Sequence, residues 1–195
     1  MKPSQKKNIL RNLCIVAGCG LIVGALVVLI FSLSSRSLYV SRCEEYVAAI
    51  RVTIPPVQSA VPEPGRNNTM PALAVDGIDF VALLEFPAFE SILPVCNAWG
   101  SPEKYPCRFT GNVHESTLII GVKEHLLPFV GELYVGDLIT LTDMTGNRFT
   151  YRITDIRITE DADRETLTNT DSALSLFVQK AFSSEYTVIR LDPSI

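Results

Sequence analysis

The run Phe149-Thr-Tyr-Arg-Ile-Thr-Asp-Ile-Arg-Ile158 alternates with the period of two that is typical of a half-buried β-strand. The alternation places Phe149, Tyr151, Ile153, Asp155 and Arg157 on one face, and Arg152, Ile156 and Ile158 on the other. The preceding segment, Asp143-Met-Thr-Gly-Asn147, contains a glycine that can take the positive φ of a tight turn. Before that turn lies another β-type run, Leu138–Thr142, so the sequence predicts a β-hairpin over residues 138–158.

Outward from this hairpin, residues 72–195 consist of short β-type runs separated by turn residues. The predicted strands cover residues 80–86, 92–96, 117–121, 138–142, 149–158, 174–178 and 186–191. Residues 97–116, with two glycines and two prolines, are predicted to be a loop, and so is the acidic stretch 159–170. Seven short strands with little helix predict a mostly-β fold, an antiparallel-rich barrel that is closed or nearly closed.

An uncharged apolar run, Leu13–Leu33, precedes the β region. At about 1.5 Å per helical residue, roughly 20 residues cross the ~30 Å hydrocarbon core of a bilayer, so this run predicts one transmembrane helix. Four basic residues precede the run and two follow it closely: Lys2, Lys6, Lys7 and Arg11 before it, and Arg36 and Arg42 after it. This asymmetry predicts a single-pass plasma-membrane protein with a cytoplasmic N-terminus and an extracellular C-terminal domain. A cleaved signal peptide is the alternative, although it favours a shorter apolar core and a small-residue cleavage motif.

Four segments follow from these patterns. Residues 1–12 are predicted to form a cytoplasmic tail, 13–33 the transmembrane helix, 34–71 a short stalk helix and a Pro-rich linker, and 72–195 the β-barrel domain. In the third segment, apolar residues recur at steps of three and four from Ser37 to Thr53, which predicts an amphipathic helix. Four prolines before Gly65 then exclude a continuing helix or a central strand.

The net charge and the small numbers of cysteines and histidines limit the partners and the metal or disulfide chemistry that the chain can have. The formal net charge of −4 argues against a nucleic-acid partner, which would require a basic face. Three cysteines, Cys43, Cys96 and Cys107, lie outside the apolar run, and three thiols permit at most one bridge within a chain. A Cys96–Cys107 bridge and unpaired packing in the core both stay open. There is no C-x-x-C motif and there are only two histidines, so the sequence predicts no metal site and no cofactor.

Five segments in order resemble the class B-like sortases of Gram-positive bacteria. Leu84–Trp99 is similar to their L-x-I-P … L-P-V … W opening, and Tyr105–Gly111 is similar to their A-P-C-R-Y-S-G segment. Leu118–Gly121 is similar to V-I-A-G-H, and Leu174–Gln179 is similar to L-T-L-F-T-C. Gly136-Asp137, together with Thr142–Tyr151, is similar to G-D … T-D-V-D-G-N-x-F-x-Y. The resemblance covers residues 72–192 and implies a sortase-like eight-stranded β-barrel behind a membrane anchor. It also implies a cysteine transpeptidase, which cleaves a sorting signal of an exported protein and joins the acyl group to a cell-wall or pilin amine.

That chemistry requires a thiolate, a histidine that carries the proton and an arginine that stabilises the oxyanion. In this chain the cysteine position of the resemblance falls on Gln179, and the histidine position falls on Val122 or Lys123. The arginine position falls on Glu185 or, with a slip of one residue, on Tyr186. None of these side chains supplies the expected group. We therefore predict a degenerate sortase-family domain, a pseudoenzyme that binds a sorting-signal-like peptide or scaffolds an active sortase or a pilin during attachment of surface proteins to the cell wall.

Two other hypotheses stay open. An active sortase would need relocated residues: His125 a few residues past the histidine position, Arg190 from the last strand, and Cys96 or Cys107 as the nucleophile. Attack geometry is tight, and a displacement of about 1 Å is costly, which weighs against replacing all three groups at once. The third hypothesis is an unrelated exported β-domain with a structural role.

Overall fold

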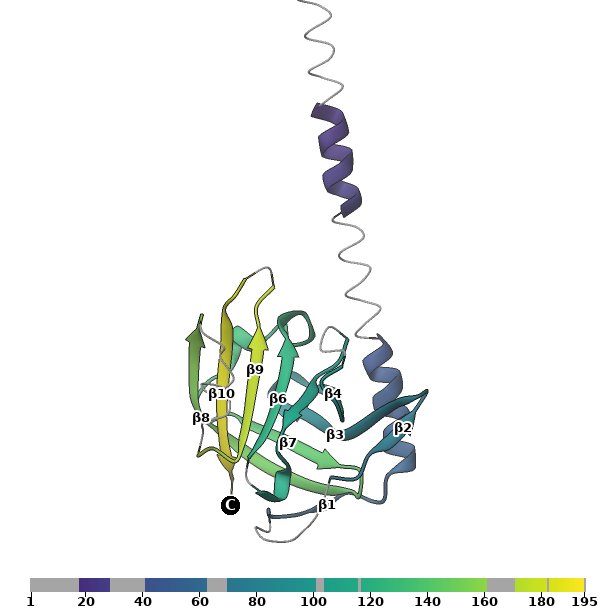
Figure 1. Ribbon diagram of the computed structural model, residues 1–195, viewed down its shortest axis with the longest axis vertical. Coiled ribbons are helices and arrows are strands. Elements are labelled where there is room, and N and C mark those ends of the chain that lie inside the picture. Colours follow the sequence, from purple (N-terminus) through teal and green to yellow (C-terminus); the bar gives the residue numbers. More distant parts are fainter. Residues whose placement is uncertain are drawn as a thin grey trace, which may run out of the picture. The chain divides into compact units, whose positions relative to one another are not determined.

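Eight strands close into a barrel in the computed structural model (Figure 1). They are β3 (Ile78–Phe86), β4 (Ser91–Cys96), β5 (Cys107–Thr110), β6 (Leu118–Lys123), β7 (Leu138–Asp143), β8 (Asn147–Thr159), β9 (Leu174–Gln179) and β10 (Tyr186–Pro193). Hydrogen-bonded neighbours follow the order β3–β4–β5–β6–β9–β10–β8, and β7 pairs with both β8 and β3, which completes the circle. Two short strands, β1 (Gln58–Ser59) and β2 (Leu73–Val75), add to β8 and β3. The predicted mostly-β, eight-stranded barrel is confirmed.

The structure describes residues 18–28, 41–62, 70–100, 104–115, 117–160, 171–181 and 183–194. The chain divides into two compact units, residues 1–39 and residues 40–195. The predicted cytoplasmic tail, both ends of the predicted transmembrane run and most of the acidic stretch 159–170 lie outside the described residues.

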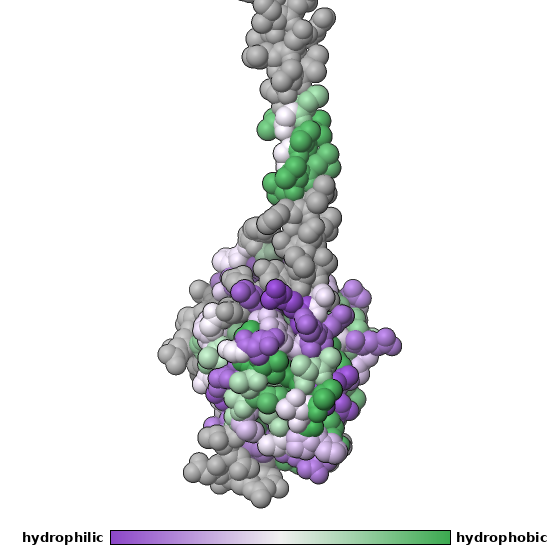
Figure 2. All heavy atoms as spheres, turned by 90° about the vertical axis from the view of Figure 1, so that its right-hand side faces the viewer, coloured by the Kyte–Doolittle hydropathy of each residue, from purple (hydrophilic) through white to green (hydrophobic). Residues whose placement is uncertain are grey.

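The described part of the first unit is a helix over residues 18–28. The face seen in Figure 2 is mostly hydrophobic, and Leu21 and Val28 are exposed by 77% and 69%. Within the described stretches, no helix combines the length and the apolar character that a membrane crossing requires.

The barrel interior is filled by large apolar side chains from nearly every strand. The largest fully buried ones on the strands are Tyr151, Phe80, Phe86, Phe149, Leu84, Leu118, Ile120, Ile139, Leu141 and Ile153. Burying one such side chain stabilises the fold by about 1.5–3 kcal/mol, so this interior supplies the main driving force for folding. The predicted inward face of the 138–158 hairpin is confirmed for Phe149, Tyr151 and Ile153, each at most 1% exposed.

A helix over residues 41–53 packs against the barrel and belongs to the second unit. Its buried side chains, Cys43, Tyr46, Val47 and Ile50, recur at steps of three and four, as an amphipathic helix requires. The Tyr46 ring lies 5.3 Å from the Phe80 ring of β3. The predicted amphipathic helix is present, but it contacts the barrel along one face, whereas a stalk would stand apart from it.

The second half of β8 departs from the predicted alternation. The β8–β10 register shifts where Arg190 pairs with Asp155 and Leu191 pairs with Ile153, so one extra residue of β8 is bulged there. Asp155 and Arg157 were expected on the same face as Ile153, and this expectation is wrong. Arg157 is largely exposed and forms an ion pair of 2.6 Å with Asp155, while Ile156 pairs with the buried Ile189.

The expectation that residues 97–116 form a loop without strands is also wrong, because β5 (Cys107–Thr110) lies within that range. The strand is short, joins β4 through one register pair and has a register shift against β6. Its four residues lie between Pro106 and Gly111, so the turn residues dominate the local sequence signal.

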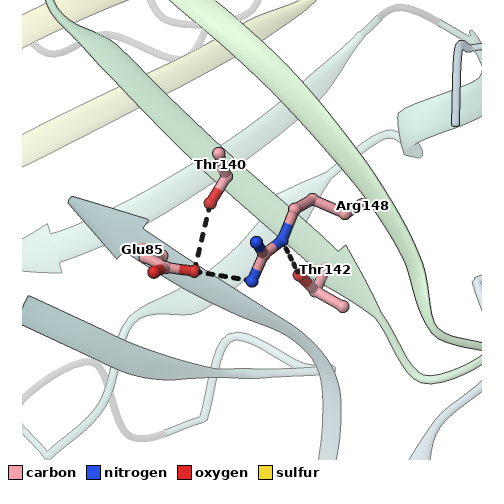
Figure 3. A network of polar contacts seen from close by, with 4 residues as sticks. All are labelled: Glu85, Thr140, Thr142 and Arg148. Carbon is pink, nitrogen blue, oxygen red and sulfur yellow. Dashed lines mark hydrogen bonds and ion pairs between the residues drawn. The ribbon is translucent and has the colours of Figure 1, made fainter. Parts of the chain in front are cut away.

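Where β7 closes the barrel, an ion pair joins its two neighbours (Figure 3). Arg148 Nη2 of β8 lies 3.0 Å from Glu85 Oε2 of β3. The hydroxyl of Thr140 donates to the same carboxylate oxygen at 3.3 Å, and Arg148 Nε donates to Thr142 Oγ1 at 3.5 Å. Both charged side chains are partly exposed, so we expect the pair to contribute less than about 1 kcal/mol and mainly to fix the register.

Candidate functional site

Three neighbouring strand ends bring the predicted site residues together. In the parallel β6–β9 pair, Lys123 lies opposite Gln179, and in the antiparallel β9–β10 pair, Gln179 lies opposite Tyr186. Lys123 Nζ donates a hydrogen bond to Gln179 Oε1. Val122, the alternative histidine position, is only 2% exposed, and alternation along β6 places it on the other face of the sheet from Lys123. Lys123 is therefore the residue of β6 that faces Gln179.

A pocket of about 490 Å³ opens at these strand ends. This strand-end pocket is lined by Lys123, Glu124, His125, Gln179, Lys180, Ala181, Ser183 and Ser184. Lys180 Nζ forms an ion pair of 2.8 Å with Glu185, and the Glu124 carboxylate accepts the backbone N–H of Ala181 at 2.9 Å. The first contact lies within the segment between β9 and β10, and the second connects that segment to η3 (Glu124–Leu126). The lining is polar, with two ammonium groups near an amide and two hydroxyl groups.

Of the residues considered as replacements for the catalytic groups, only His125 lines the strand-end pocket. Arg190 lies opposite Ser175 and donates to its hydroxyl at 2.7 Å. Ser175 precedes Gln179 by four residues, which is about 13 Å along a strand. Burial lowers the pKa of the Arg190 guanidinium from its ordinary value. Arg190 is thus held in another part of the sheet and does not reach the pocket.

All three cysteines outside the apolar run are buried, and none of them forms a disulfide. Burial, with a smaller effect of the Glu44 charge, raises the pKa of Cys43 to about 11. A hydrogen bond with Cys107, followed by burial, raises the pKa of Cys96 far above its ordinary value. A nucleophilic cysteine requires the opposite shift, toward the thiolate. Neither Cys96 nor Cys107 lines the strand-end pocket.

This arrangement predicts slow alkylation of the native protein at pH 8. Cys43, Cys96 and Cys107 should react with iodoacetamide far more slowly than the same cysteines in urea, because the folded protein buries all three thiols. Labelling of Cys43 should accelerate only as the pH approaches its pKa of about 11. Peptide mass spectrometry after timed quenching measures each site. A cysteine that labels in the native protein as fast as in urea would favour an active enzyme.

An aromatic face, made of Trp99, Phe109, Phe177 and Tyr186, lies beside the pocket. The Trp99 ring centroid lies 5.5 Å from that of Phe109 and 5.6 Å from that of Phe177. A Cβ on Gly121 would come within 2.1 Å of the Trp99 ring, so the indole lies directly on the β6 backbone. Gly121 pairs with Phe177, two residues before the Lys123–Gln179 pair, so the aromatic face shares a side of the sheet with the pocket.

Sequence reasoning did not find this face. Trp99 and Phe109 lie in the range that was predicted to be a loop, and Trp99 is still 45% exposed. The one available signal was Gly121, a glycine inside an otherwise β-branched strand, which often marks the close approach of another group.

The closed eight-stranded barrel is that of the sortase fold. Solved sortase structures match the chain, which confirms the fold that the sequence resemblance implies. A Clostridium perfringens Sortase D5 transpeptidase is 19% identical, with a TM-score of 0.53 over 60% of this chain and 80% of that chain. Sortase A from Corynebacterium diphtheriae is 14% identical, with a TM-score of 0.51 over 82% of this chain and 84% of that chain.

A third match is sortase C-1 from Actinomyces oris, which is 13% identical with a TM-score of 0.51, covering 78% of this chain and 99% of that chain. No protein-family model and no curated protein sequence matches the chain significantly. At these identities the likeness defines the fold, and the predicted class B-like subgroup stays a prediction. The third hypothesis expected a fold other than the sortase barrel, and the matches contradict that expectation.

Proposed function

We propose that this protein is a membrane-anchored, extracytoplasmic sortase-fold domain that binds peptide and does not catalyse transpeptidation. The observation that carries the proposal is Gln179 at the end of β9, held by Lys123 in the strand-end pocket. A carboxamide nitrogen is not basic and does not form an acyl intermediate as a thiolate does. The thiols of Cys43, Cys96 and Cys107, all in the described part of the chain, are buried and do not line this pocket.

The membrane part of the proposal rests on the sequence. The uncharged run over residues 13–33 is long enough to span a bilayer, and the greater positive charge before it favours a cytoplasmic N-terminus. The β-barrel would then lie outside the plasma membrane, where exported peptides pass.

The shape and chemistry of the site support a peptide as its ligand. The polar pocket and the aromatic face share one side of the β6–β9 pair, so an extended chain can place an apolar side chain on Trp99 and a polar group near Lys123. Apolar contact area with a few placed polar groups is typical of ligand sites. Because the chain resembles sortases, we propose that the ligand is a sorting-signal-like peptide. An active sortase or a pilin would dock on the same surface.

Binding of a fluorescein-labelled sorting-signal peptide to the full chain in detergent micelles tests this proposal by fluorescence anisotropy. Lys123→Ala should weaken binding about five- to tenfold, because a charge-assisted contact contributes roughly 1–1.4 kcal/mol. Arg51→Ala, which removes an exposed positive charge on the helix 41–53, is the matched control and should leave affinity unchanged. Absence of saturable binding, or equal losses in both variants, would contradict the proposed site.

A further inference from the structure

Cys96 and Cys107 lie directly opposite each other on neighbouring strands. They form the one register pair recorded between β4 and β5, and the Cys96 N–H donates to the Pro106 carbonyl at 2.8 Å. Paired strands lie about 4.8 Å apart, within the 4.4–6.8 Å between Cα atoms that a disulfide spans. Because only one pair joins these strands, the backbone has room to adjust on either side.

The two cysteines are buried side by side on neighbouring strands. Cys107 Sγ donates to the Tyr105 carbonyl oxygen at 3.4 Å, and the neighbouring Cys107 thiol raises the pKa of Cys96. Their exposed fractions are 6% and 0%, so solvent reaches neither sulfur freely. Neither cysteine forms a disulfide in this structure, and neither lines the strand-end pocket.

We propose that Cys96 and Cys107 are a dithiol pair that a disulfide-class oxidant, such as glutathione disulfide, converts to an intramolecular disulfide. One thiol loses its proton and its sulfur attacks the oxidant, so a mixed disulfide forms and one glutathione thiol leaves with a proton. The second thiol then loses its proton and attacks the mixed disulfide, which releases the second glutathione thiol. The pair loses two electrons and two protons, and one oxidant molecule is reduced to two thiols.

The disulfide would join the residues on either side of segment 97–106. This segment contains Trp99, whose ring packs on Gly121 and Phe177. A disulfide here restricts the unfolded chain and so stabilises the folded state. It also adds a covalent link between β4 and β5, which are joined by one register pair. Since the native thiols are buried, the reaction takes place during folding or on local opening of this segment.

The test is refolding of the full chain in detergent micelles with a glutathione disulfide and glutathione buffer, then alkylation, trypsin and mass spectrometry. Trypsin cleaves after Lys104, so it separates the peptide 67–104, which contains Cys96, from the peptide 105–108, which contains Cys107. The expected product is one disulfide joining these two peptides, with Cys43 alkylated in its own peptide, 43–51. The oxidised protein should melt about 5–10 °C higher than the reduced protein.

Cys43→Ser is the matched control and should keep both the bridge and the rise in melting temperature. Cys96→Ser and Cys107→Ser should each lose both. If these single variants fold poorly, the peptide map of the wild type decides the question without them. Recovery of peptides 67–104 and 105–108 only in the alkylated form, or a bridge mapped to Cys43, would overturn the proposal.

Discussion

Gly111→Ala is expected to remove about 3 kcal/mol or more of the free energy of unfolding, enough to unfold a marginal domain. Gly111 has a φ of +79°, and an added Cβ would lie 1.9 Å from the carbonyl oxygen of Thr117. The obstructing atom belongs to the backbone just before β6, so no side-chain rotation relieves the contact. The strained φ costs about 1 kcal/mol or more, and overpacking adds about 1–3 kcal/mol. Urea unfolding followed by circular dichroism measures the loss.

Gly77→Ala is the matched control for this prediction. Gly77 has nearly the same φ, +77°, but nothing lies within 4 Å of an added Cβ. It should therefore lose only the conformational part, about 1 kcal/mol. Equal losses for the two variants would show that the close approach of Thr117 to Gly111 is not what constrains the chain there.

Asp143→Ala is expected to cost about 3 kcal/mol, the second largest effect. Asp143 is 2% exposed at the end of β7, and its Oδ1 accepts the backbone N–H groups of Thr145 and Asn147, each at 2.9 Å. The Thr145 hydroxyl donates to the same oxygen at 2.8 Å, and the Asn147 amide donates to Oδ2 at 3.2 Å. Removing the carboxylate leaves these donors without their acceptor in a partly buried turn, which costs roughly 1–3 kcal/mol for each group that neither water nor the protein then satisfies.

Asp137→Ala provides the comparison in another turn of the same barrel. Its carboxylate accepts one exposed backbone N–H, from Tyr134 at 2.9 Å. We expect a loss below about 1 kcal/mol by the same urea unfolding assay, because water replaces an exposed partner. If the two aspartates contributed equally, the buried carboxylate of Asp143 would not be the feature that fixes the β7–β8 hairpin.

The parts of the fold that the sequence predicted are those that local patterns specify. The hairpin over residues 138–158 was predicted because alternation, β-branched residues and a turn glycine agree within one short segment. The end of β8 was mispredicted because a bulge depends on pairing with β10, which no local pattern in β8 records. β5 was missed because its pairing with β4 and β6 is made by tertiary contacts between residues that are distant in sequence.

The candidate site also contains residues that the sequence predicted and residues that it did not. The resemblance predicted Lys123, Gln179 and Tyr186 as related positions, and the strand register brings these three residues side by side. The position of Trp99 was not predictable, because it depends on a long-range contact with the backbone at Gly121. Ser183 and Ser184 were likewise missed, since short polar residues between strands carry no signal of a pocket.

Transpeptidation by the full chain tests the central claim most directly. The protein in detergent micelles is incubated with a sorting-signal peptide and an oligoglycine amine, and the products are followed by mass spectrometry. We predict that the peptide stays intact, because Gln179 supplies no nucleophile where β9 ends. An amide product that forms with the wild type and disappears in His125→Ala, Cys96→Ser or Cys107→Ser would contradict the account and establish an active enzyme.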